Sequence, residues 1–200
     1  MIEVRPGGRR RIDRVLDPGY VAGLDQLELA EVRARRDDAA QEETDLSYLR
    51  RLLQARIDIV RAEQRRRREG GGAPLVAELG QILAVNAVEA NPGSGRVHTL
   101  QPSRAEAHRR HVEALVADVD LSNVGALSGE QLEGALQAYG TEEQSVSARH
   151  REVQRVLDTF NAEIGSRYAS GAASVDELLA EQRQLTEPDK ARTAGTEQPA

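Results

Sequence analysis

The clearest hydrophobic pattern in the chain lies in residues 46–60, where apolar side chains recur at helical spacing. Leu46, Leu49, Leu53, Ile57 and Val60 follow one another at steps of three or four. They therefore share one side of an α-helix and form a seam of the kind that packs against a second helix. Neither glycine nor proline occurs between positions 29 and 69. The pattern predicts a helix over about residues 29–69, roughly 60 Å long.

A stripe of polar residues runs beside this seam at steps of four, three, four and four. At about 100° per residue, its members fall within an arc of roughly 80°. They are Glu43, Ser47, Arg50, Gln54 and Asp58. We call them the first stripe.

The same pattern returns one hundred positions later. A second seam is formed by Val146, Val153, Leu157 and Phe160, with Arg149 in the place of Leu49. The second stripe consists of Glu143, Ser147, His150, Gln154 and Asp158. Because four polar residues and most of the seam recur at matching offsets, we interpret the two segments as a duplication.

Two such helices packed antiparallel would place the Glu43 end of one stripe near the Asp158 end of the other. The stripes would then be related by an approximate two-fold axis. Each stripe spans about 22 Å, which suits a two-fold ligand, or a pair of ligands, of nucleotide-dimer size. Carboxylates accept hydrogen bonds from the N1 and N2 edge of guanine, and arginine binds guanine O6 and N7 or a phosphate through two bonds. The stripes therefore favour a ligand that contains guanine and phosphate.

The spacing Glu-x3-Ser-x2-Arg-x3-Gln-x3-Asp at 43–58, repeated with one change at 143–158, resembles the cyclic di-GMP-binding repeat of RsiG-type anti-sigma factors of actinobacteria. The flanking segments IDRVLDPGYVAGLDQLELAEVRARR and RYASGAASVDELL support the resemblance, which covers roughly residues 10–180. It implies an antiparallel coiled coil that binds a dimer of cyclic di-GMP. The loaded protein would sequester a WhiG-type sigma factor and block sporulation transcription. The resemblance makes the two stripes the ligand-binding residues.

One position departs from this repeat. His150 stands where the first copy has Arg50, and a neutral histidine lacks the charged fork of arginine. Arg151, at the edge of the second stripe, could supply the missing charge and is added to the predicted site. We expect the second half-site to be weaker or pH-sensitive.

The rest of the chain predicts an all-α protein with short helices packed on the long antiparallel pair. Residues 1–16 are basic and predict a flexible arm, and Asp17-Pro18-Gly19 predicts a turn or short helix start. Tyr20, Val21, Leu24, Leu27 and Leu29 could dock on the coiled coil. We expect Arg65 to Arg68 and the following glycines to end the first long helix. The predicted domain covers residues 17–185, followed by a disordered tail at 186–200.

Turn formers and capping boxes divide the second half of the domain. Pro74 opens a helix to about residue 85, and residues 86–102 predict a loop. Capping boxes at Ser103 and Ser128 predict helices to about residues 119 and 139, the latter ended by Gly140. A further box at Thr141 predicts the second long helix over 141–168, despite Gly165. Ser174 starts a last short helix.

Composition narrows the classes of function. The chain has no cysteine and a net charge of −6, which exclude a disulfide framework and argue against general nucleic-acid binding. No apolar run long enough to span a membrane and no signal peptide are evident, so we expect a cytoplasmic, monomeric protein that contacts neither membrane nor DNA.

Two alternatives remain beside the anti-sigma factor. The repeat could be only the solvated face of a coiled-coil scaffold that binds no nucleotide. A metal-dependent cyclic dinucleotide phosphodiesterase is disfavoured, because Glu43 and Asp58 lie about four turns apart on one helix and metal ligands must converge on one point. His108 and His111 are three apart without a recognisable third ligand, so we predict no metal site. We also predict no cofactor and no catalytic residues.

Overall fold

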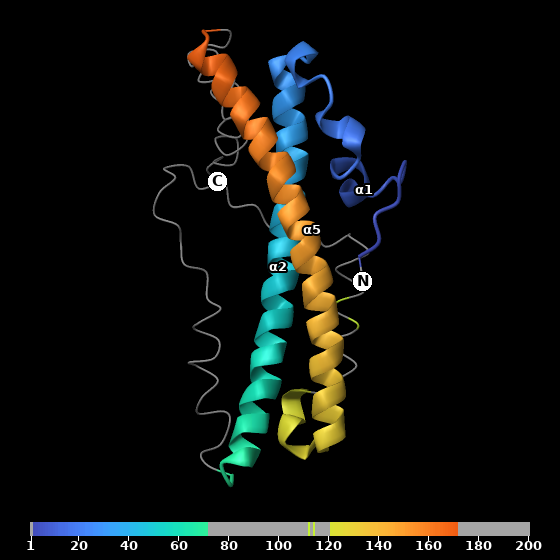
Figure 1. Cartoon of the computed structure of the whole chain (residues 1–200), viewed down its shortest axis with the longest axis vertical. Coiled ribbons are helices and arrows are strands. Elements are labelled where there is room, and N and C mark those ends of the chain that lie inside the picture. Colours follow the sequence, from blue (N-terminus) through green and yellow to red (C-terminus); the bar gives the residue numbers. More distant parts are fainter. Residues whose placement is uncertain (1, 72–111, 113, 115–120, 172–200) are drawn as a thin grey trace, which may run out of the picture.

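Two long helices form the body of the protein. The structure is a computed structural model that describes residues 2–71, 112, 114 and 121–171. Helix α2 (Leu29–Arg68) runs along the whole molecule, and α5 (Gly129–Ala169) returns beside it in the opposite direction (Figure 1). The other labelled elements are short: α1 (Arg11–Val15), η1 (Pro18–Val21), η2 (Leu24–Gln26) and η3 (Leu121–Ala126). The predicted all-α antiparallel hairpin is confirmed, and the described residues include no strand.

The predicted seams form the contact between the long helices. Leu46, Leu49, Leu53 and Val60 of α2 have no exposed surface, and neither do Val146, Val153 and Phe160 of α5. Only Leu157 is partly buried. The interior consists mainly of aliphatic side chains at helical spacing, together with the fully buried rings of Tyr139 and Phe160.

Helix α2 has the predicted bounds. Its last four residues are arginines, whose positive charge complements the C-terminal end of the helix dipole. Gly70 and Gly71 follow with φ of 84° and 85°, in the left-handed region that stops a helix and that glycine enters without steric cost.

Helix α5 is longer than predicted. It begins at Gly129, where Ser128 and Gln131 form the expected capping box, and it continues through Gly140. The predicted break at Gly140 and the new start at Thr141 are therefore wrong. Thr141 Oγ1 donates to Gln137 O at 2.9 Å, one turn back within the helix, and so caps nothing. A glycine inside a helix costs about 1 kcal/mol, which the buried Tyr139 and Val146 on either side offset.

The N-terminal residues are packed, contrary to the expected flexible arm. Ile2 is 4% exposed, and Ile12 and Val15 are fully buried. Figure 1 shows this segment beside the upper half of the helix pair. The arginines dominated the sequence pattern, but the apolar residues between them bury enough surface to hold the segment in place.

The turn before α2 has the predicted form. Asp17 caps η1 by accepting a hydrogen bond from Gly19 N. Leu24 is buried with Val32 and Phe160, and Tyr20, Val21 and Leu27 pack against this cluster. This docking of the predicted residues, which ties the start of α2 to the end of α5, is confirmed for these four.

Several predictions lie outside the described residues. They are the helix at 74–85, the loop at 86–102, the histidine pair at 108 and 111, the helix from residue 174 and the tail at 186–200. The helix at 103–119 is described only at Val112 and Ala114, and both are helical. No helix within the described ranges is both long and apolar enough to cross a membrane.

Candidate functional site

The two stripes meet across the helix interface. Ser47 Oγ donates to Glu43 Oε1 at 2.8 Å. His150 Nε2, from the other helix, lies 2.9 Å from Ser47 Oγ and 2.8 Å from Glu43 Oε1. Because an ionised carboxylate only accepts hydrogen bonds, Nε2 carries the proton in this contact. The structure thus brings Glu43, Ser47 and His150 together. The predicted approach of the Glu43 end to the Asp158 end is wrong, because the helices pack with Glu43 beside His150, which precedes Asp158 by about two turns.

This cluster is electrostatically coupled. The hydrogen bond from His150 lowers the pKa of Glu43, and the hydrogen bond from Ser47 acts in the same direction against the effect of burial. His150 is only 5% exposed. His150, which replaces the arginine of the first stripe, is therefore buried, and its ring binds Glu43 of the opposite stripe.

The equivalent residues of the other half repeat part of this arrangement. Ser147 Oγ donates to Glu143 Oε1 at 2.7 Å, as Ser47 does to Glu43. Glu143 shares a surface pocket of about 210 Å³ with Arg50, Arg51 and Gln54. Glu143 therefore faces the Arg50 side of the first stripe, just as Glu43 faces His150. These pairs are two-fold equivalents under the offset of one hundred.

The outer members of the stripes lie more openly. Gln54 Nε2 donates to Asp58 Oδ1 at 3.0 Å within the first stripe. Arg50, Arg151, Gln154 and Asp158 are exposed. The structure thus joins the stripes directly through Glu43, Ser47 and His150 and places Glu143 in one pocket with Arg50 and Gln54. The other exposed groups extend along the surface from there.

The two-fold relation extends well beyond the stripes. Arg67 donates to Glu63 at 2.6 Å and to Leu127 O at 2.7 Å, in the segment before α5. Arg167, one hundred positions later, donates to Glu163 at 2.7 Å and to Leu27 O at 2.7 Å, in the segment before α2. Each long helix thus fastens its last turns to the start of the other.

A family comparison shows which family this helix pair belongs to. The RsiG-like family model matches residues 18–83 and 118–182, more than half of the chain. The chain belongs to the RsiG-like family. The matched regions contain both stripes and both long helices. No curated protein matches the chain.

Two features of this RsiG-like pair were missed by the sequence analysis. Arg51 lines the pocket beside Glu143, although it lies outside the family spacing. The offset could have shown it, because its equivalent is Arg151, which was included. The Glu63–Arg67 and Glu163–Arg167 pairs lie beyond the stripes but recur at the same offset of one hundred, which could have predicted them.

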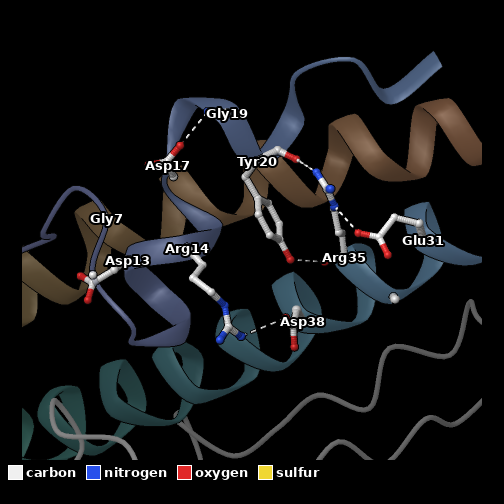
Figure 2. A pocket seen from close by; sticks show the side chains of 11 residues that line it. Gly7, Asp13, Arg14, Asp17, Gly19, Tyr20, Glu31, Arg35 and Asp38 are labelled. Atoms are coloured by element: carbon white, nitrogen blue, oxygen red, sulfur yellow. Dashed lines mark hydrogen bonds and ion pairs between the residues drawn. The ribbon is translucent and has the colours of Figure 1, made fainter. Parts of the chain in front are cut away.

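A larger pocket lies outside the stripes. It has a volume of about 670 Å³ and is bordered by α1, η1 and the first part of α2 (Figure 2). Tyr20 donates to Arg35 O at 3.1 Å, and Arg14 reaches Asp38 at 3.1 Å. Burial raises the pKa of Tyr20 to about 12, so its hydroxyl stays neutral. The charged groups in this pocket largely bind one another. Within the described residues, no group of three or more His, Asp or Glu could hold a metal ion.

Proposed function

We propose that this protein is an anti-sigma factor that binds a dimer of cyclic di-GMP along the two stripes and, when loaded, sequesters a WhiG-type sigma factor. One observation supports the proposal most directly: residues of the two stripes meet across the helix interface at two-fold equivalent positions. The chain also belongs to the RsiG-like family, which is an anti-sigma factor family. The protein then acts by binding and catalyses no reaction.

The polar groups match the chemistry of the ligand. Glu43, Asp58 and their equivalents Glu143 and Asp158 can accept hydrogen bonds from guanine, and the exposed Arg50 and Arg151 can bind phosphate. A pocket of about 210 Å³ is smaller than ordinary drug-sized sites of about 300–1,000 Å³. Two cyclic dinucleotides would therefore lie along the stripes and be largely held on an open surface.

Part of this site is already engaged in contacts within the protein. Glu43 is bound by His150 and Ser47, so guanine must replace these contacts to reach its carboxylate. Binding then exchanges a direct contact between the helices for one that passes through the ligand. The mutual position of α2 and α5 would change with it, and this change would present the surface that binds the sigma factor. By linkage, the sigma factor must tighten cyclic di-GMP binding by the same factor.

Isothermal titration with cyclic di-GMP tests the ligand. Removing a charge-assisted contact costs about 1.5–3 kcal/mol, so Arg50→Ala and Asp58→Ala should each weaken binding by roughly 10- to 100-fold. Arg56→Ala is the matched control. Arg56 lies six residues after Arg50 on α2 and, at about 100° per residue, points to the side of the helix away from the first stripe. Its loss should leave affinity unchanged.

Other outcomes of the titration identify the alternatives. Absence of saturable binding to the wild-type protein would favour the scaffold without a nucleotide ligand. A cleaved dinucleotide after incubation with divalent metal would favour the phosphodiesterase. A second titration, of a WhiG-type sigma factor with and without cyclic di-GMP, tests the switch, and equal affinities in the two experiments would contradict it.

A further inference from the structure

The residues before the family match form a strap across both long helices. We use "N-terminal strap" for residues 2–16, which precede the matched region at residue 18. On one side, Ile2 N donates to Ser145 Oγ at 2.8 Å and Arg149 Nε donates to Ile2 O at 3.2 Å. Both backbone polar groups of Ile2 are therefore bound to α5.

The other side of the N-terminal strap is fastened to α2. Arg11 Nε donates to Glu42 Oε2 at 2.9 Å, and Arg11 Nη2 donates to Asp45 Oδ2. The carboxylates are 0% and 3% exposed, and the Arg11 side chain is 14% exposed. Buried charges of this kind depend on one another, because removing one partner leaves the other without compensation.

The strap also has a fixed shape of its own. Asp13, which is 2% exposed, accepts hydrogen bonds from Arg5 N at 2.9 Å and from Arg10 Nε at 2.7 Å. A Cβ atom at Gly8 would overlap the Asp13 carboxylate and lie 2.8 Å from Arg5 O. Only glycine therefore allows the chain to pass so close to this carboxylate. The strap joins α2 to α5 as a rigid link.

The strap and the stripes use the same turns of the two helices. Glu42 and Asp45 lie one and two positions from Glu43 in the sequence, and Arg149 lies beside His150. Adjacent residues point about 100° apart on a helix, so the strap lies on a different side of the helices from the stripes. It connects these turns at the level where Glu43 meets His150.

The second repeat departs from the first at the residues that bind the strap. Asp45 corresponds to Ser145, and Leu49 corresponds to Arg149. Serine can accept the Ile2 amide, and arginine can donate to the Ile2 carbonyl. Two of the changes that make the repeats unequal therefore form the binding site for the strap on α5.

We infer that the N-terminal strap is a positioning element for the ligand site. It holds the turn of Glu43 and Ser47 against the turn of His150, so that both stripes face one ligand pair at a fixed separation. This inference rests on the proposed function, because it assigns a role in the binding of cyclic di-GMP to residues that do not touch the stripes.

Arg11→Gln and Ser145→Ala test the inference, each releasing one side of the strap. Both should weaken cyclic di-GMP binding by roughly 2- to 30-fold, the range of mutations that act on a site from a distance. The titrations are made at a temperature where circular dichroism shows full folding. Arg14→Gln is the matched control, since Arg14 lies three residues after Arg11 and forms only an exposed pair with Asp38. The Arg14→Gln variant should bind cyclic di-GMP with the affinity of the wild type.

Hydrogen exchange without ligand separates this inference from the proposed function. Arg11→Gln should speed exchange around residues 43–50 and 145–152, whereas Arg14→Gln should not. Faster exchange confined to residues 2–16, or unchanged affinity in a folded Arg11→Gln variant, would overturn the inference. If the wild-type protein fails to bind cyclic di-GMP, the proposed function fails, and the exchange result still decides whether the strap holds the two turns together.

Discussion

Replacing Glu63 by glutamine should destabilise the protein in a pH-dependent way. The Glu63 side chain is 1% exposed and accepts hydrogen bonds from Arg66 Nε at 2.7 Å and from Arg67 Nε at 2.6 Å. Arg67 in turn donates to the carbonyls of Gly125 and Leu127. The carboxylate therefore orients the arginine that fastens the end of α2 to the beginning of α5.

The shift in the pKa of Glu63 sets the size of the expected loss of stability. Hydrogen bonds from Arg66, followed by those from Arg67, lower this pKa from 4.5 to about 2, despite the opposing effect of burial. At about 1.4 kcal/mol for each pH unit, this difference corresponds to at most roughly 3 kcal/mol. The two arginine side chains are 29% and 32% exposed, and solvent screens their charge. We therefore expect a loss of about 1–3 kcal/mol at neutral pH.

The direction of the pH dependence follows from the lowered pKa. The folded state favours the ionised carboxylate, so the stabilisation is complete above pH 4.5 and decreases as the pH falls toward about 2. Urea unfolding of the wild type and Glu63→Gln at about pH 7 and about pH 3.5 measures the loss of stability at each pH. The difference between the two proteins should be smaller at the lower pH.

Glu163→Gln is the control, because Glu163 is the two-fold equivalent of Glu63. Its side chain is 25% exposed and accepts from Arg167 at 2.7 Å. A partly exposed pair of this kind contributes about 0–1 kcal/mol, so this variant should lose less stability. Equal losses in the two variants, or a loss for Glu63→Gln that is the same at both pH values, would refute the reasoning.

A further prediction concerns the core. Phe160 is fully buried, and the Tyr20 ring packs edge-on against it with 5.6 Å between the ring centroids. Phe160→Ala should therefore cost about 3–5 kcal/mol of stability in urea unfolding, and a loss below about 1 kcal/mol would contradict this packing.

The long helices could be predicted because their pattern is local. Leu46, Leu53 and Val60 lie at helical spacing, and the arginines and glycines that end α2 adjoin it in the sequence. Gly140 misled the prediction of α5 because the residues that hold the helix together around it are buried against α2. That packing is a property of the assembled pair and not of the segment, and tertiary contacts commonly override local preference.

The N-terminal strap was harder to predict for a related reason. Arg11 looks like part of a solvated basic run until Glu42 and Asp45, more than thirty residues away, provide its partners. A sequence signal was nevertheless present. Residues 9–16, RRRIDRVL, resemble residues 109–116, RRHVEALV, at the offset of the stripes. Ile12 and Val112 correspond in this comparison, and both are fully buried in one cluster. The repeat therefore includes apolar positions that a pattern of charge alone conceals.

The departures from two-fold symmetry explain how a duplicated chain can carry unequal halves. A pair of identical nucleotides requires only that the stripes be equivalent, and Glu43, Ser47 and Gln54 have identical equivalents in the second copy. His150, Ser145 and Arg149 differ from their counterparts, and they bind Glu43 and Ile2. These changes lie within two turns of α5. The same short segment of α5 therefore makes the two stripes unequal on one side of the helix and binds the strap on another. Both sides of α5 differ from the first repeat within these two turns.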